Sequence, residues 1–408
     1  MSTSKRIQIY SFYGIISLCL VISMITESRS FTLGCSVVLI LSFCYLQKIT
    51  SRLRLMLFAS LFVLGVILIC FFKSDSSSGR LLIYKVSVDM LNDKLLIGHG
   101  SGMFKSTYLI HQAKYFSSVG YTQKELLLAD NTHYAFNDYY QFLIDYGLLS
   151  ISIVLLMSFY LIRIGLRKIL ESNVGLLYML SLAAIIIIMT AAAFNHIFEK
   201  PVYQSVFLLG IFLVLKAHLR SGYPVGFLST VYIILQCGII CFAFNYQVFH
   251  YSHYQKNKEA HELYSSGFLN KSLTMLQDIY PTYKTDSFYL EFYGRVLLRS
   301  GQHLKALKML EQAALIAPNS ELLKTIGDCY CQLRDLIRSE KYYKLAIDMV
   351  PNRFGSRYAL FNFYILTNQN SAALKTGVEI LNLPVKVPSQ RVEIILKSVS
   401  EKMNAINQ

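Results

Sequence analysis

Long apolar runs recur along the first 250 residues, and charged residues become frequent only from about Tyr251 onward. A transmembrane helix needs about 20 mostly apolar residues, and in lipid its backbone must satisfy its own polar groups. The pattern therefore predicts a polytopic bundle of about seven helical spans. We place them near residues 8–25, 31–47, 54–72, 139–162, 175–196, 201–217 and 225–248.

Charges between the apolar runs predict the orientation of the bundle. Cytoplasmic loops carry an excess of Lys and Arg. Basic residues follow Met1 closely and recur in every second loop: Lys5 and Arg6; Lys48, Arg52 and Arg54; Arg163, Arg167 and Lys168; Lys216 and Arg220. We therefore expect a cytoplasmic N-terminus, an outer loop over 73–138, and a C-terminal domain outside the cytoplasm.

The first 30 residues permit a second interpretation. A basic start followed by an apolar run is also typical of a secretory signal peptide. Ser28-Arg29-Ser30 is a poor cleavage site, so we favour a retained helix. Cleavage would leave the topology of the remaining spans unchanged.

The C-terminal part, residues 251–408, carries an internal repeat. Pro318, Pro351 and Pro384 are each separated by 33 residues. A period near 34 with two helices per unit is the tetratricopeptide signature. Small and large positions recur in register: Gly294, Ala306 and Ala313 in one unit; Gly327, Tyr330, Ser339, Tyr343 and Ala346 in the next; Ala372 in a degenerate last unit; Gly267, Ser272 and Pro281 in a weaker earlier one.

These patterns predict an all-α chain with two domains. Residues 1–250 form the membrane domain and 251–408 form an α-solenoid. Solenoids present a curved face to protein partners, which we expect here. A formal net charge of +15 would suggest nucleic acid in a soluble protein. Much of it lies in short loops between spans, so we expect no nucleic-acid partner.

The outer loop carries several motifs in order. Arg80 is followed four residues later by Tyr84, and a glycine turn runs from Gly98 to Phe104. The loop ends in His133-Tyr134-Ala135-Phe136-Asn137-Asp138, and Asp145-Tyr146-Gly147 follows closely. No βαβ context surrounds the glycines, so they do not indicate a dinucleotide site.

In order, spacing and sidedness these motifs resemble the O-antigen ligase and O-antigen polymerase superfamily of bacterial surface-polysaccharide synthesis. The resemblance covers about residues 9–217 and includes Ser28-Arg29-Ser30. Phe136 stands where the family usually has a histidine, and His133 is the nearest replacement. Family members also usually have more spans before the Ser-Arg motif.

The resemblance implies transfer of a glycan from a polyprenyl diphosphate to an acceptor hydroxyl, at the outer face of a bacterial inner membrane. The leaving diphosphate requires positive charge, which arginine supplies through bidentate contacts. The expected catalytic residues are Arg80, His133 and Asn137, and the expected substrate-binding residues are Arg29, Tyr84, Gly98 and Gly100. We expect no metal and no cofactor.

Structural roles stay open for these residues. Arg29 could equally be an arginine whose side chain extends to the lipid–water interface. Arg80 could equally be a surface charge at the start of a helix. His133 fits a solvated loop histidine, and Asn137 fits a helix cap. The alternative function is a shortened, inactive family member that serves as a membrane-anchored repeat scaffold.

Overall fold

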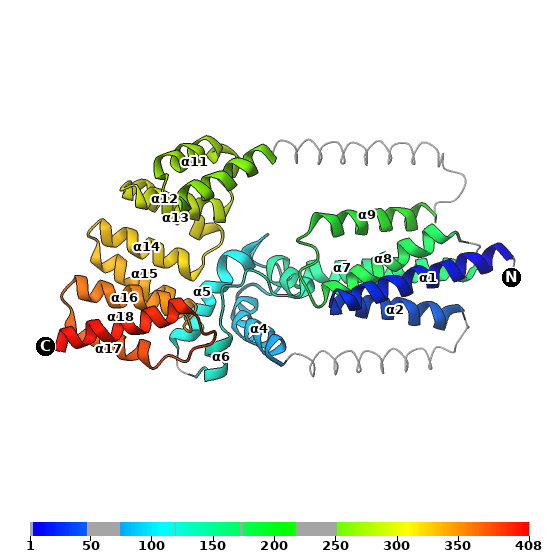
Figure 1. Cartoon of the computed structure of the whole chain (residues 1–408). Helices are drawn as coiled ribbons and strands as arrows, with labels where there is room; N and C mark the ends of the chain where they lie inside the picture. Colours follow the sequence, from blue (N-terminus) through cyan, green and yellow to red (C-terminus); the bar gives the residue numbers. More distant parts are fainter. Residues whose placement is uncertain (1–2, 47–73, 119, 172–173, 218–250, 408) are drawn as a thin grey trace. The chain divides into compact units, whose positions relative to one another are not determined.

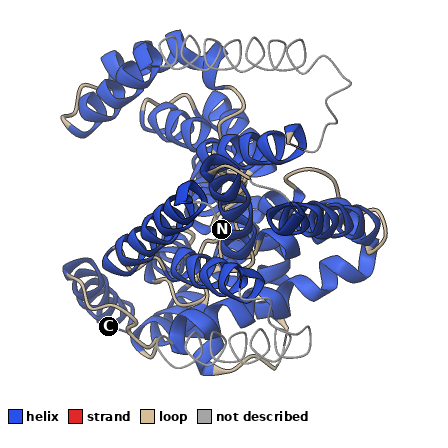
Figure 2. Ribbon diagram, turned by 90° about the vertical axis from the view of Figure 1, so that its right-hand side faces the viewer, coloured by secondary structure: helices blue, strands red, loops and turns tan. Residues whose placement is uncertain are grey.

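The computed structural model describes residues 3–46, 74–118, 120–171, 174–217 and 251–407. All regular secondary structure in these ranges is α-helical, and none of it is strand (Figure 2). The all-α prediction is therefore confirmed. The chain divides into two compact units. The membrane unit comprises Met1–Arg80, Leu91–Ser101 and Tyr134–Leu235, and the repeat unit comprises Leu81–Met90, Gly102–His133 and Gln236–Gln408.

The membrane unit packs its described helices around α8 (Figure 1). Its core is apolar throughout and includes Phe12, Val38 and Leu182. Gly34 lies on the α2–α8 contact, where a Cβ would come within 3.0 Å of the Ile187 backbone. Its helices are α1 (Thr3–Ile25), α2 (Arg29–Leu46), α7 (Asp138–Glu171), α8 (Leu176–Ala192) and α9 (Pro201–Lys216).

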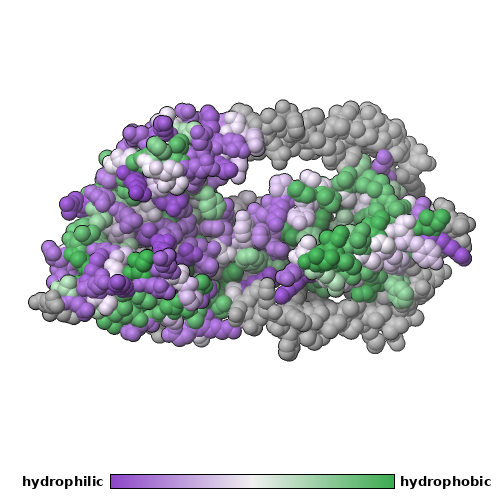
Figure 3. Space-filling view, viewed as in Figure 1, coloured by the Kyte–Doolittle hydropathy of each residue, from purple (hydrophilic) through white to green (hydrophobic). Residues whose placement is uncertain are grey.

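Apolar side chains also cover the outside of this unit. Two helices, Lys5–Ile25 and Asp138–Ile169, are long and apolar enough to cross a membrane, and only 17% of each apolar window is buried. Hydrophobic residues therefore face outward, as Figure 3 shows over much of the unit, which suits lipid rather than water. Shorter apolar helices cover Arg29–Phe43, Leu176–Ala192 and Pro201–Lys216.

That the chain has seven membrane spans stays a prediction. Five of the predicted spans coincide with these apolar helices. The other two, near 54–72 and 225–248, lie outside the described residues. The predicted domain boundary near residue 250 lies in the same undescribed stretch.

The repeat unit is a series of antiparallel helix pairs (Figure 1). Residues 251–265 are helical and pair with α11. The remaining helices are α11 (Leu269–Tyr283), α12 (Ser287–Arg299), α13 (His303–Ile316), α14 (Ser320–Gln332), α15 (Leu336–Met349), α16 (Phe354–Leu366), α17 (Asn370–Leu381) and α18 (Gln390–Asn407).

The two helices of each pair are joined by the same type of turn. Four residues in the turns have positive φ, namely Gly267, Gly301, Arg334 and Asn368. At Arg334 the backbone N–H donates to Cys331 O, and the next N–H, of Asp335, donates to Tyr330 O. These two bonds define a Schellman cap, which satisfies carbonyls that the ending helix leaves open. The same bond pattern occurs at the other three turns.

The predicted prolines and small residues perform the expected structural roles. Pro318, Pro351 and Pro384 each follow the second helix of a pair within three residues. A Cβ at Gly294 would come within 2.6 Å of Leu310, and one at Gly327 within 2.8 Å of Tyr343. Close helix crossing therefore requires glycine at both positions. Pro281 differs, because it lies inside α11.

Part of the predicted outer loop belongs to the repeat unit. It forms α5 (Met103–Ser117) and α6 (Gln123–Leu128), and α5 packs mainly on α15. A capping box between Thr122 and Glu125 starts α6. The Lys85 ammonium lies 2.7 Å from the Glu125 carboxylate and joins α4 (Ser74–Lys94) to α6.

Candidate functional site

The glycine turn and the start of α7 interlock in the membrane unit. Gly147 has φ +78 and breaks α7 there. A Cβ on Gly98 would lie 2.4 Å from Asp145 O, and one on Gly147 would lie 2.3 Å from Leu96 O. The two backbones therefore approach more closely than any side chain permits. This contact explains why the glycine turn and the acidic-x-Gly segment occur together.

Backbone hydrogen bonds hold this contact. The N–H groups of His99 and Gly100 donate to Ile144 O and Asp145 O at 3.0 and 2.8 Å. The N–H of Leu148 donates back to Leu95 O at 2.8 Å. These amides are engaged within the chain, which gives Gly98 and Gly100 a structural role. Their part in substrate binding stays a prediction.

Asn137 and Asp138 organise the start of α7. The Asn137 Oδ1 accepts the Tyr140 N–H at 3.1 Å, as an N-cap does. The Asp138 Oδ2 accepts the N–H groups of Ile197 and Phe198 at 2.6 and 3.1 Å. The α8–α9 loop, residues 193–200, is thereby fixed beside the end of the outer loop. The capping interpretation of Asn137 is the one that these contacts support.

Gln141 adds a second link between the same segments. Its Oε1 accepts the Ala135 N–H at 3.1 Å, and its Nε2 donates to Glu199 Oε1 at 3.3 Å. Tyr139 extends the connection inward by donating its hydroxyl to Met189 O at 2.8 Å. Hydrogen bonds therefore join residues 134–141 and 193–200 into one corner of the membrane unit.

A cluster of Arg80, Tyr134, Phe136 and His196 occupies this corner. The His196 ring stacks on Tyr134, with centroids 4.4 Å apart and planes 6° apart. The Phe136 ring meets the His196 ring edge-on at 5.6 Å. On Phe136 lies the Arg80 guanidinium, with Cζ 5.8 Å from the ring centroid. We call these four residues the Arg80–His196 cluster.

Backbone strain at Phe136 accompanies the cluster. Its φ is +53, a region that bulky residues rarely adopt. Strain of this kind costs of the order of 1–3 kcal/mol and persists only where surrounding contacts enforce it. Here the Asn137 cap and the Gln141 bond on either side hold the backbone.

Burial and neighbouring charges shift the pKa values of His196 and Tyr134 in the cluster. Burial lowers the pKa of His196 below its ordinary value, and the Lys200 charge lowers it further against the opposing charge of Glu199. Burial and the Glu199 charge raise the pKa of Tyr134. At neutral pH the imidazole is therefore uncharged and able to accept a proton.

The environment of Arg80 differs from the sequence expectation in one respect. A helix was predicted to begin near Arg80, but α4 begins at Ser74. Arg80 therefore lies inside the helix, beyond the free N–H groups of its first turn. The free N–H groups of a helix N-terminus therefore do not assist anion binding at Arg80. Tyr84 follows one helical turn later, in the part of α4 that belongs to the repeat unit.

Arg29 lies at the same end of the membrane unit as the cluster. It is exposed at the first position of α2. Two residues later, Phe31 packs on a small core that includes Ile197 and Phe198 of the α8–α9 loop. The Phe31 and Tyr203 ring centroids are 5.3 Å apart, which brings the starts of α2 and α9 together.

His133 belongs to the repeat unit and has different neighbours. Its ring meets Phe288 edge-on at 6.2 Å. Burial lowers its pKa, and the Lys105 charge acts in the same direction. The histidine that accompanies Phe136 is instead His196. Sequence reasoning missed it, although Asn195-His196 lies in a short loop on the side predicted to be outer.

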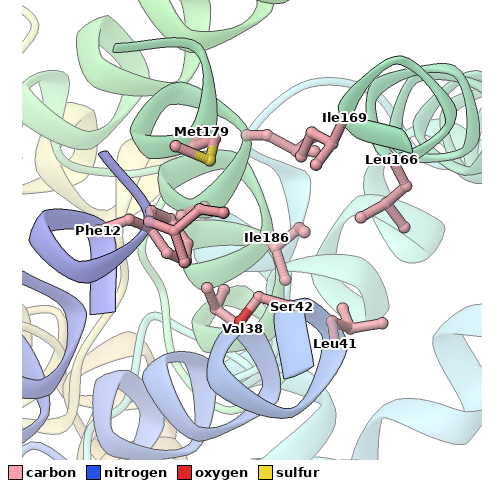
Figure 4. Close-up of a pocket in the computed structure, with 11 residues that line it drawn as sticks. Phe12, Val38, Leu41, Ser42, Leu166, Ile169, Met179 and Ile186 are labelled. Carbon is pink, nitrogen blue, oxygen red and sulfur yellow. The ribbon is translucent and has the colours of Figure 1, made fainter. Parts of the chain in front are cut away.

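Two other features bear on ligands. An apolar pocket among α1, α2, α7 and α8 is lined by residues such as Phe12, Leu41 and Leu166 (Figure 4). It lies towards the ends of these helices that are opposite the cluster, and its lining has no charge for a diphosphate. Among the described residues, no group of three or more His, Cys, Asp or Glu side chains is placed to hold a metal ion.

A comparison with known protein families matches part of the membrane half. Residues 14–155 match the family model described as O-antigen ligase. The similarity of these residues to that family confirms the resemblance that the motifs indicated. No curated protein matches the sequence.

Several solved structures are similar to a part of this chain. MamA from residue 41 to its end, from Desulfovibrio magneticus RS-1, is 14% identical, with 38% of this chain and 92% of that chain covered and a TM-score of 0.31. YrrB, described as a TPR protein with an unusual peptide-binding site, is 15% identical, with 37% and 84% covered and a TM-score of 0.28.

Proposed function

We propose that this protein is a membrane glycosyltransferase of the O-antigen ligase/polymerase type. It would transfer a glycan from a polyprenyl diphosphate to an acceptor hydroxyl. The observation that carries the proposal is the Arg80–His196 cluster, inside a membrane unit that includes an O-antigen ligase domain. We place the protein in a bacterial inner membrane, with the cluster and the repeats on the outer side.

The cluster offers the two functions that the reaction needs. In the proposed step, neutral His196 takes the proton of the acceptor hydroxyl while the acceptor oxygen bonds to the anomeric carbon. The bond from that carbon to the diphosphate oxygen breaks, and its electron pair leaves with the diphosphate. Arg80 neutralises the charge that develops there, and Arg29 provides a second cation at the same end.

The test is complementation of a deletion strain, with surface glycan and protein level measured together. Arg80→Ala should slow transfer about tenfold to several-hundredfold, because a hydrogen bond to a charged group contributes roughly 1.5–3 kcal/mol. Arg80→Lys should recover only part of the activity, since lysine lacks the bidentate fork. Arg163→Ala, an exposed arginine towards the opposite end of α7, is the matched control and should keep full activity.

The same strain distinguishes the alternative function. An anchored scaffold needs the membrane half only as an attachment, so Arg80→Ala and His196→Ala would both retain normal glycan. That result, at normal protein level, would overturn the enzymatic proposal.

A further inference from the structure

The repeat unit holds a segment that is distant from the repeats in sequence. α5 packs on α13 and α15, and the residues from α6 to Asn131 contact the start of α14 and the turn after α15. The contacts join residues separated by 189 to 237 positions. Figure 1 shows α5 beside α15 in this arrangement.

Asn352 makes the densest set of these contacts. Its Nδ2 lies 2.9, 3.0 and 2.7 Å from the carbonyl oxygens of Leu126, Leu127 and Ala129. The side chain is buried, so these carbonyls have no ready replacement in water. One amide group thereby satisfies the open carbonyls at the end of α6.

The corresponding asparagine of the preceding repeat, Asn319, has different hydrogen-bond partners. Asn319 follows Pro318 as Asn352 follows Pro351. Its Oδ1 caps α14 by accepting the Leu322 N–H at 2.8 Å, and its Nδ2 donates to Glu291 at 2.9 Å. Asn352 does not occupy the N-cap of α16, which is Arg353. The same position therefore maintains its own repeat in one case and binds the α6 segment in the other.

Two further residues, Asn131 and Gln112, add polar contacts. The Asn131 Oδ1 accepts the Ser320 N–H at 3.0 Å, and the Asn131 Nδ2 donates to Ser320 Oγ at 3.1 Å. This N–H belongs to the first turn of α14 and has no acceptor within its own helix. On α5, buried Gln112 donates to Met349 O at 2.6 Å and to Asp130 O at 3.1 Å.

An ion pair adds to these bonds at the edge of the surface. The Arg353 guanidinium lies 2.7 Å from the Asp130 carboxylate. Both groups are partly exposed, so the pair contributes little by itself. The specificity of the contact therefore comes from the buried amides of Asn352 and Gln112 and the half-buried amide of Asn131.

We infer that the start of α14 and the turn after α15 form an intramolecular binding surface whose partner is the chain's own residues 103–118 and 120–131. A third protein therefore does not use this surface while the segment is bound. The surface acts as a clamp on the stretch that continues, three residues after Asn131, into Tyr134 of the cluster.

Hydrogen exchange of the full-length protein in detergent tests the clamp without any activity measurement. Asn352→Asp keeps the size of the side chain but cannot donate to the three carbonyls. We expect exchange of the amides in 123–131 to rise about tenfold to a hundredfold, since each lost bond contributes about 1 kcal/mol. Asn352→Ala should give the same result.

Asn319→Ala is the matched control. It removes the cap of α14, so exchange should rise within α14 and near Asn131, which bonds to Ser320, but stay unchanged in α6, residues 123–128, which Asn352 binds. The clamp is refuted if both Asn352 variants leave exchange of 123–128 unchanged, or if Asn319→Ala raises exchange there equally. Surface glycan from the same variants then reports separately on catalysis.

Discussion

His196 lies beside Phe136 in one corner of the membrane unit. Its proposed role as a base makes the rate of glycan transfer depend on pH. Because the pKa of His196 is lowered, the ring stays neutral at pH 7 and gains a proton only at lower pH. Transfer should therefore fall as the pH drops through this lowered pKa. The acidic limb of the pH–rate profile should disappear in His196→Ala.

The size of the His196 effect follows from its proposed role. Loss of a general base slows a reaction by roughly 10²–10⁴-fold. We expect His196→Ala to lose activity in this range, while His133→Ala keeps most of it, because His133 contacts Phe288 in the repeat unit. Surface glycan after complementation measures both variants. A severe loss in His133→Ala with normal activity in His196→Ala would reverse the assignment.

Gly98 gives a stability prediction with an internal control. In Gly98→Ala the new Cβ would lie 2.4 Å from the Asp145 carbonyl oxygen, and alanine would be strained at φ +71. We therefore expect the free energy of unfolding to fall by at least about 3 kcal/mol. Gly102 has the same φ but nothing within 4 Å of its Cβ position. Gly102→Ala should therefore cost only about 1 kcal/mol. Thermal unfolding in detergent should separate the two variants clearly.

Gly98, Gly147 and His196 show which parts of the site can be predicted from the sequence and which cannot. The glycine turn at 98 was predicted, because glycine readily adopts positive φ, whereas the break of α7 at Gly147 lies inside the expected span 139–162 and was not predicted. Their mutual contact depends on two segments meeting in space, and no local pattern encodes it. His196 was missed for this reason, since its neighbours Tyr134 and Phe136 lie about sixty residues earlier.

At the scale of elements, the helix pairs were predicted because their signals are local and periodic. Proline spacing, small residues at crossings and the turn positions all lie within one repeat. The binding of α5 and α6 by the repeats left no such signal. Asn319 and Asn352 occupy equivalent positions after a proline, and only the structure distinguishes a helix cap from a contact with α6.

The repeat turns allow a stability prediction at this scale. Arg334 takes the left-handed conformation that Gly301 takes one repeat earlier. A non-glycine residue there costs roughly 1–2 kcal/mol, which glycine avoids at some expense in chain entropy. Arg334→Gly should therefore stabilise the repeat unit by about 0.5–1 kcal/mol.

Gly301→Ala is the counterpart and should destabilise the unit by about 1 kcal/mol. Denaturant unfolding followed by circular dichroism measures both changes. Equal midpoints for both variants and the unchanged protein would show that these turns do not limit stability.

At the scale of the whole molecule, the predicted topology can be tested directly. A cytoplasmic N-terminus and seven spans put the C-terminus in the periplasm. A phosphatase fused after Gln408 should then be active, and one inserted near Lys48 should be inactive. A fluorescent protein that needs the cytoplasm should give the opposite pattern, and the reverse of both results would contradict the topology.

The clamp also sets an order of events during synthesis. Leu126 leaves the ribosome 226 residues before Asn352, the residue that binds its carbonyl. At about 5–20 residues per second, this interval is roughly 10–45 s. For that time the apolar face of α5, with Phe104, Tyr108 and Leu109, has no repeat surface to cover it. The nascent chain is then most exposed to proteases and to aggregation, and premature termination before residue 352 would leave it in that state.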